Sequence, residues 1–215
     1  LVGSEMCIRD RGMEYLFRMT HIDNIPHILK YGITHRLSAN ADANYKPIGD
    51  SSIIQKRSLK MVCTVNGEEL IPGDYIPFYF YVRMPMLYNI QHGYNVNRVS
   101  PENIVYLVVK LDSIVKDDNY KYYFSDGHAV CKMTRFYGRE SISDIDNILD
   151  KKSIQNNDWG NDYTTRERKQ AEFLVGSDIP PEYIVMMGCY NERARTRLID
   201  NGVQCKIIVT LKSYF

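Results

Sequence analysis

Apolar residues along the chain recur mostly in short runs, which predict strands more often than helices. The run at residues 104–111 (IVYLVVKL) is almost continuously apolar and predicts the most buried strand. The aromatic segment at 74–81 predicts another strand, with Pro77 on an edge or at the strand start because proline cannot donate a backbone hydrogen bond. Further strands are predicted at 14–19, 122–124, 183–188 and 205–211, and a short one begins at His128.

Three segments show the spacing of apolar residues that is typical of a helix. The first begins at Asp23, a predicted N-cap, and ends before Gly32. The other two cover residues 141–149 and 191–199. Because these helices lie between strands without alternating with them regularly, the pattern favours an α+β fold over a doubly wound parallel sheet.

Polar segments interrupt this pattern. Residues 34–60 contain Asn, Pro, Gly and Ser at irregular positions and predict a long functional loop that carries Arg57. Residues 151–163 are also polar and contain the only tryptophan, Trp159. The segment at 164–169 is rich in cations and hydroxyl groups and is interpreted as a loop before the next strand.

Length and composition indicate a single globular domain. With 215 residues, 44% of them hydrophobic and 25% charged, the chain can bury a substantial core. No apolar run approaches the ~18 residues that a membrane-spanning helix needs, so no membrane partner is predicted. Residues 1–12 lack the apolar core of a signal peptide and are interpreted as a non-native leader, which leaves residues 13–215 as the domain.

Charge and cysteine content restrict the partners and the compartment. The formal net charge of +1 predicts that a nucleic acid would bind a local basic patch and not the whole surface. Five scattered cysteines without a Cys-x-x-Cys pair favour a reducing, cytoplasmic location. Neither they nor the five histidines have metal-ligand spacing, so no metal is predicted. The 17 tyrosines suit a cleft that stacks bases, although packing in a β-rich fold is their commoner use.

An acidic residue inside a strand-like apolar run, Glu172, is the first candidate for chemistry. Residues two apart in a strand face the same side, so Gln170 and Glu172 are predicted to face one cleft. Phe173 and Val175 would then enter the core behind them. The alternative is a strand that begins at the surface and leaves Glu172 in solvent.

Other polar residues could surround such a cleft. Residues at the end of the first strand could together hold a nucleotide, or could be solvated beside a capped helix. They are Arg18, Thr20, His21 and Asn24. Arg57 could pair with a phosphate through two hydrogen bonds, or could lie on the surface. His128, after the turn at 125–127, could act as an acid, a base or a hydrogen-bond donor, or could simply be partly exposed.

Two further segments suit a ligand. Met86 lies in a kinked segment that could form one wall of a cleft with the aromatic strand before it; core filling is the alternative. The basic segment at 164–169 could position the phosphates of an anionic polymer, or could be a helix turn with internal ion pairs. Its candidate residues are Thr164, Thr165, Arg166, Arg168 and Lys169.

Three segments, in order along the chain, match the motifs of one protein family. They are residues 18–24 (RMTHIDN), 74–88 with DYIPFYF, Arg83 and PMLY, and 168–175 (RKQAEFLV). With them the chain resembles, over residues 13–215, the DarT family of toxins, DNA-base ADP-ribosyltransferases of bacterial toxin–antitoxin systems. The resemblance implies a diphtheria-toxin-like, PARP-like ADP-ribosyltransferase fold, with two packed antiparallel sheets and flanking helices around an NAD cleft.

The resemblance also implies roles for individual residues. Glu172 matches the catalytic glutamate, Arg57 an essential basic residue near the NAD phosphates and the target, and His128 a histidine near the substrate site. Arg18 stands where some relatives have histidine. The residues that would contact NAD are Arg18, Thr20, His21, Asn24 and Arg57. Those that would contact DNA are Met86, Thr164, Thr165, Arg166, Arg168 and Lys169.

The reaction that the resemblance implies is the transfer of ADP-ribose from NAD to a base of single-stranded DNA, with thymidine favoured over guanosine. Breaking the nicotinamide–ribose bond builds positive charge on the sugar, which the Glu172 carboxylate could stabilise. Arg57 or His128 beside it could assist the transfer. A macrodomain-type antitoxin is the expected protein partner. Two alternatives stay open: an RNA or protein acceptor on the same fold, and a nucleic-acid-binding module without turnover.

Overall fold

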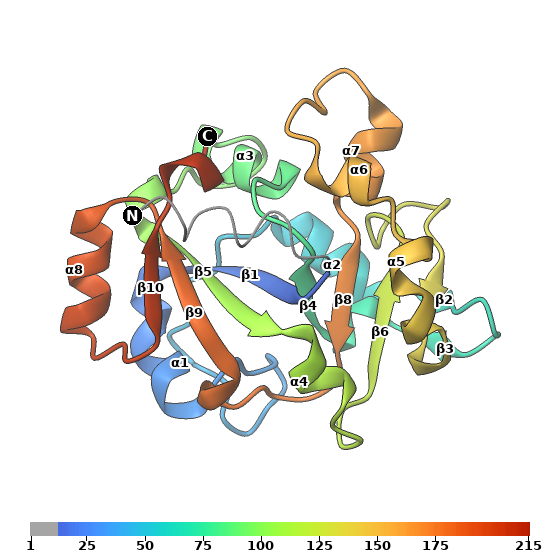
Figure 1. Cartoon of the computed structure of the whole chain (residues 1–215), viewed down its shortest axis with the longest axis horizontal. Coiled ribbons are helices and arrows are strands. Elements are labelled where there is room, and N and C mark those ends of the chain that lie inside the picture. Colours follow the sequence, from blue (N-terminus) through green and yellow to red (C-terminus); the bar gives the residue numbers. More distant parts are fainter. Residues whose placement is uncertain (1–12) are drawn as a thin grey trace.

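The computed structural model describes residues 13–215, so the interpretation of residues 1–12 as a leader lies outside the described residues. The chain forms an eight-stranded sheet in the order β10-β9-β5-β1-β4-β8-β6-β7, and β2 and β3 pair separately (Figure 1). The strands are β1 Tyr15–His21, β2 Val62–Cys63, β3 Glu69–Leu70, β4 Ile76–Tyr79, β5 Ile104–Lys110, β6 Tyr122–Ser125, β7 Phe136–Tyr137, β8 Glu172–Val175, β9 Ile184–Cys189 and β10 Lys206–Val209.

The strands expected from the apolar pattern are present, with one exception. The chain forms no strand at His128; it turns there, because its backbone N–H donates to the carbonyl oxygen of Glu167 (3.1 Å) instead of to a neighbouring strand. Strand β5 is the buried centre that the sequence predicts. Its residues alternate between two apolar clusters, with Val105 and Leu107 in one and Tyr106 and Val108 in the other. The sheet is therefore covered on both faces.

The sheet consists of two four-stranded halves that remain joined. Strand β1 pairs with β5 along its whole length but with β4 only at Phe17 and Tyr79. The two sheets that the fold class implies are thus continuous through this one register pair. The pairing is antiparallel except between β9 and β10, which are parallel because a helix connects them in a crossover.

The separation of β1 from β4 explains the position of a proline in an interior strand. Pro77 is the second residue of β4, as the strand-start prediction allows. Its carbonyl oxygen, which would otherwise face β1, accepts a hydrogen bond from Nη1 of Arg18 (2.9 Å). Because β1 does not pair with β4 here, the missing N–H of the proline leaves no backbone acceptor of β1 without its partner.

Short helices surround the sheet. They are α1 Ile25–Tyr31, α2 Ser51–Leu59, α3 Pro85–His92, α4 Leu111–Val115, α5 Ile145–Ile148, α6 Lys151–Gln155, α7 Tyr163–Lys169 and α8 Glu192–Asp200. In Figure 1, α8 lies beside β10 at one end of the sheet, α3 lies near the C-terminus, and α6 and α7 lie beyond the start of β8. Predicted helices at 23–31, 141–149 and 191–199 correspond to α1, to a 3₁₀ turn followed by α5, and to α8.

Two segments interpreted as loops are helical. In the segment 34–60, Asp50 accepts hydrogen bonds from the backbone N–H groups of Ser52 (2.8 Å) and Ile53 (3.3 Å) and caps α2. In the segment 164–169, Asp162 caps α7 in the same way through Thr165 N (3.1 Å). The residues of α2 and α7 show only weak apolar periodicity, so the apolar pattern does not predict these two helices.

The N-terminal cap near α1 also differs from the prediction. His21 accepts the hydrogen bond from Asp23 N through Nδ1 (3.1 Å), whereas the Asp23 carboxylate binds Lys46. The helix ends as predicted at Gly32, whose φ of 80° and ψ of −163° are a backbone conformation almost restricted to glycine. A Cβ at this position would also lie 2.0 Å from the carbonyl oxygen of Ile179.

Candidate active site

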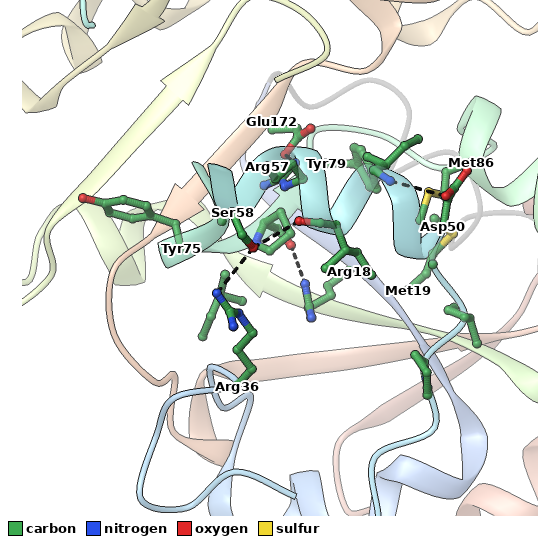
Figure 2. Close-up of a pocket in the computed structure, with 18 of the residues that line it drawn as sticks. Arg18, Met19, Arg36, Asp50, Arg57, Ser58, Tyr75, Tyr79, Met86 and Glu172 are labelled. Carbon is green, nitrogen blue, oxygen red and sulfur yellow. Dashed lines mark hydrogen bonds and ion pairs between the residues drawn. The ribbon is translucent and has the colours of Figure 1, made fainter. Parts of the chain in front are cut away.

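A cavity of about 220 Å³ opens where β1 separates from β4, and α2 covers it. Its walls come from these elements, from α3 and from the segment 34–50, and Glu172 of β8 lies at its base. Figure 2 shows Arg57 pointing toward Glu172, with Tyr79 beside the pair and Arg18 and Arg36 below it. The gap between the two halves of the sheet therefore provides the space for a ligand.

Glu172 is the best-supported residue of this cavity. It is the first residue of β8 and is only 1% exposed, which excludes the alternative of a solvated strand end. Its Oε2 forms an ion pair with Nη1 of Arg57. Its Oε1 lies 3.5 Å from the backbone N–H of Ala129, and its own N–H donates to Oγ of buried Ser125 (3.2 Å). The carboxylate is thus held at the base of the cavity from two sides.

Arg57 reaches this position from α2. It is 9% exposed, and its Nη2 donates to the carbonyl oxygen of Pro72 (3.3 Å). Burial alone would lower the pKa of Arg57, but the Glu172 carboxylate outweighs this and the pKa is raised. The guanidinium is therefore a permanent cation beside Glu172, which excludes the alternative of a surface arginine.

Two neutral groups lie next to the charged pair. Tyr79 is the register partner of Glu172 across β4 and β8. Burial, and next the charge of Glu172, raise the pKa of Tyr79 far above its ordinary value, so the phenol stays protonated. Burial lowers the pKa of His128 against the opposing effect of Glu172, so its imidazole is neutral near pH 7. A neutral imidazole can accept or donate a proton beside the carboxylate.

Three of the four residues predicted at the end of the first strand meet at one place. Arg18, Thr20 and Asn24 line a small hollow that adjoins the main cavity, and Arg18 lines the main cavity as well. Asn24 donates to Thr20 Oγ1 and to the carbonyl oxygen of Lys46, 3.0 Å each, and fixes the segment that leads to α2. His21 lines neither hollow and caps the turn before α1 instead. Three of the four predicted residues therefore gather in one place, and His21 does not.

Met86 lies where the sequence predicts it, whereas Gln170 does not. Met86 lies in the wall of the cavity, as expected. Gln170 does not share a strand face with Glu172, because it ends α7 and donates to the carbonyl oxygen of Arg166 (3.1 Å). Strand geometry begins only at Glu172.

The residues of α7 lie beyond the main cavity. Thr164 and Arg168 line a second hollow, which Gly127 also lines, while the next residue, His128, faces the first. Arg168 pairs with Asp150 (2.8 Å), and Thr165 binds Asp162. Of the predicted set, Thr164, Arg166 and Arg168 thus share the accessible surface of α7, whereas Thr165 is buried.

Lys169 is also buried and therefore does not belong to that surface. It is 1% exposed, and its Nζ donates to the carbonyl oxygen of Ile154 (2.8 Å). The sequence pattern could not reveal this, because the adjacent Arg168 has the same charge and remains half-exposed. Lys169 is therefore a structural cation and not a direct DNA contact.

The aromatic segment 74–81 does line the cavity, as the sequence suggests, through Tyr75 and Tyr79, whereas Arg36 was not predicted. Arg36 has no local sequence signal; it reaches the cavity from the segment before α2, and its Nη2 donates to Ser58 Oγ (3.4 Å). Its position depends on packing between distant segments.

Neither a membrane-spanning helix nor a cluster of metal-ligating side chains occurs among residues 13–215. No helix among these residues is long and apolar enough to cross a membrane. No group of three or more His, Cys, Asp or Glu side chains among them could hold a metal ion, and the prediction of no metal stays a prediction.

Comparisons with known proteins agree with this geometry. Residues 17–215 match the model of a family described as ssDNA thymidine ADP-ribosyltransferase, DarT. A DNA ADP-ribosyl transferase of Escherichia coli O127:H6 is 34% identical over 187 residues, which cover 85% of this chain and 83% of the relative. A fusion of a DNA ADP-ribosyl transferase and a DNA ADP-ribosyl glycohydrolase from Thermosipho africanus is 29% identical over 170 residues, 79% of this chain and 40% of the fusion.

Solved structures show the same fold. Thermus sp. 2.9 DarT in complex with ADP-ribosylated ssDNA aligns with a TM-score of 0.81 and 26% identity over 95% of this chain and 99% of that chain. The same protein in complex with NAD⁺ aligns with a TM-score of 0.76, 26% identity and the same coverage. The large sheet, the cavity over Glu172 and these matches lead to one conclusion: the chain belongs to the DarT family of ssDNA thymidine ADP-ribosyltransferases.

Proposed function

We propose that this chain transfers ADP-ribose from NAD to a thymidine base of single-stranded DNA, and that Glu172 and Arg57 carry the transfer. The observation on which the residue assignment rests is their ion pair, buried at the base of the cavity. In the reaction the bond between nicotinamide and the ribose C1′ breaks, and nicotinamide leaves with the bonding electrons. A base nitrogen then bonds to C1′ and loses its proton.

Glu172 is proposed to stabilise the sugar as its bond to nicotinamide breaks. The positive charge that develops on the ribose is of the kind that a nearby carboxylate stabilises in glycosyl transfer. The same carboxylate can accept a hydrogen bond from a ribose hydroxyl and so orient the sugar. Its fixed position matters because a carboxylate that must first move or lose water stabilises the developing charge less effectively.

Arg57 and His128 are proposed to support the two ends of the reaction. The Arg57 guanidinium holds the Glu172 carboxylate and can also bind a phosphate of NAD, because it has several donors in a planar arrangement. The proton of the attacking base can pass to Glu172 or to the neutral His128 ring, both of which line the cavity.

For NAD binding, Arg18 is the strongest candidate from the first strand, since its side chain lines the cavity. Thr20 and Asn24 are proposed to act indirectly, by holding the segment at Lys46 through hydrogen bonds of 2.8–3.0 Å. His21 has no cavity contact that supports such a role.

A direct test uses the protein with NAD and a mixture of single-stranded oligonucleotides, followed by mass spectrometry of the released nucleosides. We expect the mass of ADP-ribose on thymidine, together with one nicotinamide per modified base. Parallel reactions with RNA and with unfolded protein test the alternative acceptors. Modification of either of these but not of DNA would contradict the proposal.

For the DNA contact on α7 we expect Arg166→Ala to weaken the binding of single-stranded DNA and to leave NAD binding unchanged. Arg166 does not line the NAD cavity, and its guanidinium lies 5.5 Å from the Tyr163 ring and is not in an ion pair among the described residues. Loss of one phosphate contact should reduce the slope of log K against log salt by about 1.

The matched control for this variant is Lys30→Ala. Lys30 also lies over a tyrosine ring, that of Tyr31 at 4.7 Å, but on α1 at the other side of the sheet (Figure 1). Fluorescence anisotropy at several salt concentrations and calorimetric NAD titration measure the two affinities. Equal losses of DNA and NAD affinity in Arg166→Ala would exclude the assignment.

The partner and compartment are proposed on the same basis. The Thermosipho africanus relative combines a DNA ADP-ribosyl transferase with a DNA ADP-ribosyl glycohydrolase in one chain. An enzyme that removes the modification is therefore a plausible antagonist, and we assign a macrodomain-type antitoxin to this role. Since NAD and DNA are its substrates, we place the protein in the cytoplasm.

A further inference from the structure

Five aromatic side chains form a cluster around α3, which we call the α3 aromatic cluster. Its members are Tyr88, His92, Tyr94, Trp159 and Phe215. The Tyr88 and His92 rings stack at 4.1 Å between centroids, and the His92 and Tyr94 rings are nearly parallel at 5.8 Å. Trp159 and Phe215 meet Tyr88 edge-on at 5.8 and 5.2 Å. Such a column of rings is open at one end, because Tyr94 is 53% exposed.

The cluster and the active site share helix α3. Met86 and Ile90 line the cavity over Glu172, whereas Tyr88 and His92, two residues further along in each case, carry the cluster on the opposite face of the helix. Trp159 comes from the segment that leads into α7, the helix proposed to contact DNA. In Figure 1, α3 and the segment before α7 lie on the same side of the molecule, near the C-terminus. A strand that passes from the cavity around α3 would therefore meet these rings.

Positive charge accompanies the rings without nearby compensation. The Arg83 guanidinium lies 4.5 Å from the Phe215 ring centroid. Lys169 is buried behind it, and burial, and next the charge of Arg83, lower the pKa of Lys169 to about 8. In the part of the chain that the structure describes, no carboxylate forms an ion pair with either residue. The surface is therefore suited to an anionic ligand.

We infer that the α3 aromatic cluster binds the nucleotides that flank the modified base, with a base stacked on Tyr94 and the backbone phosphates near Arg83. The inference rests on the proposed function, because it assigns a second contact surface to the same single-stranded DNA. Stacked rings beside a cation are the combination by which proteins hold single strands without reading every base. Each nucleotide of a single strand carries a flat base that can stack on a ring, whereas the surface of a folded protein presents few such faces. A nucleotide strand is therefore the better match to the cluster.

The inference predicts that oligonucleotide length matters and that Tyr94 is responsible. For the wild-type protein we expect KM to fall about tenfold when a minimal oligonucleotide is extended by several nucleotides on both sides of its single thymidine. Tyr94→Ala should lose this gain while keeping the KM of the minimal oligonucleotide, the KM of NAD and kcat. Tyr31→Ala is the matched control, since the Tyr31 ring also packs against a histidine ring, that of His27 at 4.8 Å between centroids, and Tyr31 is 38% exposed on α1.

A binding measurement separates this inference from the proposed function. Trp159 is the only tryptophan, so its fluorescence reports on the cluster directly. Titration with a thymidine-rich oligonucleotide in the absence of NAD should change this fluorescence in the wild-type and Tyr31→Ala proteins, and Tyr94→Ala should need about tenfold more oligonucleotide.

The outcomes are distinct. If DNA is modified but KM is independent of length, or if Tyr94→Ala binds and reacts like the wild type, the flanking surface is wrong while the proposed function stands. If no acceptor base is modified, the proposed function is wrong, and the fluorescence titration still decides whether the cluster binds single strands. A tenfold loss that extends to NAD or to the minimal oligonucleotide would also overturn the inference, because it would place Tyr94 in the active site itself.

Discussion

Replacement of Glu172 by glutamine is expected to reduce the rate of DNA modification about 10²–10³-fold, because it removes the charge that faces the developing positive sugar. The substitution keeps the size of the side chain and one oxygen acceptor, and it replaces the other oxygen by an amide donor. NAD affinity should therefore change much less than kcat, which is the pattern expected when an interaction is stronger in the transition state than in the ground state. Single-turnover modification of an oligonucleotide and calorimetric NAD titration measure the two quantities.

The control for this variant is Glu182→Gln, which removes the same charge from an exposed residue outside the cavity. Its activity should equal that of the wild type. Glu172→Gln at the wild-type rate would show that the reaction uses another residue. Circular dichroism of both variants is needed, since Glu172 is also a structural partner of Arg57.

The sequence predicts the parts of this fold that depend on local pattern. Strand β5 is recognisable because all but its last residue are buried, on both faces of the sheet. Glu172 stands out because a charged residue begins an apolar strand, and the burial of Phe173 and Val175 follows from the strand period. These features require no knowledge of distant contacts.

The features that the sequence does not predict depend on contacts between distant segments. Arg57 is 115 residues from Glu172 in the chain, and α2 turns it inward only because the gap between β1 and β4 lies beneath that helix. The family resemblance, and not the local pattern, connects the two residues. Lys169 and Arg168 are adjacent cations, but Lys169 is buried and Arg168 is half-exposed. Only the packing of α7 against α6 distinguishes them.

The resemblance also has a limit that the geometry makes clear. The segment RMTHIDN suggests one continuous nucleotide contact, yet the 3₁₀ turn after the strand keeps His21 out of the hollow that Arg18, Thr20 and Asn24 share. Arg18 faces the cavity, Asn24 holds the neighbouring segment, and His21 caps the turn. A motif can therefore identify the site while most of its polar residues build the walls.

The second large effect is expected from Arg57→Met, which removes the guanidinium but keeps an apolar side chain of similar length. The variant should lose DNA modification about 10²-fold or more, because the Glu172 carboxylate loses the partner that orients it. It should also be destabilised by about 3–5 kcal/mol, since one buried charge then remains without its partner. Lys56→Met on the exposed face of α2 should change the free energy of unfolding by less than about 0.5 kcal/mol.

The double variant Arg57→Met, Glu172→Gln decides whether the two residues act as one unit. If they do, removing both charges should destabilise the protein by about 1–3 kcal/mol less than the sum of the single variants, because neither charge is left buried alone. Catalysis should behave in the same way: the double variant should be about as inactive as the worse single variant, since either substitution already disables the pair. Urea unfolding and single-turnover rates of all four proteins complete the cycle. Additive losses in both measurements would mean that Arg57 binds NAD independently of Glu172, and its role would then be that of a phosphate contact alone.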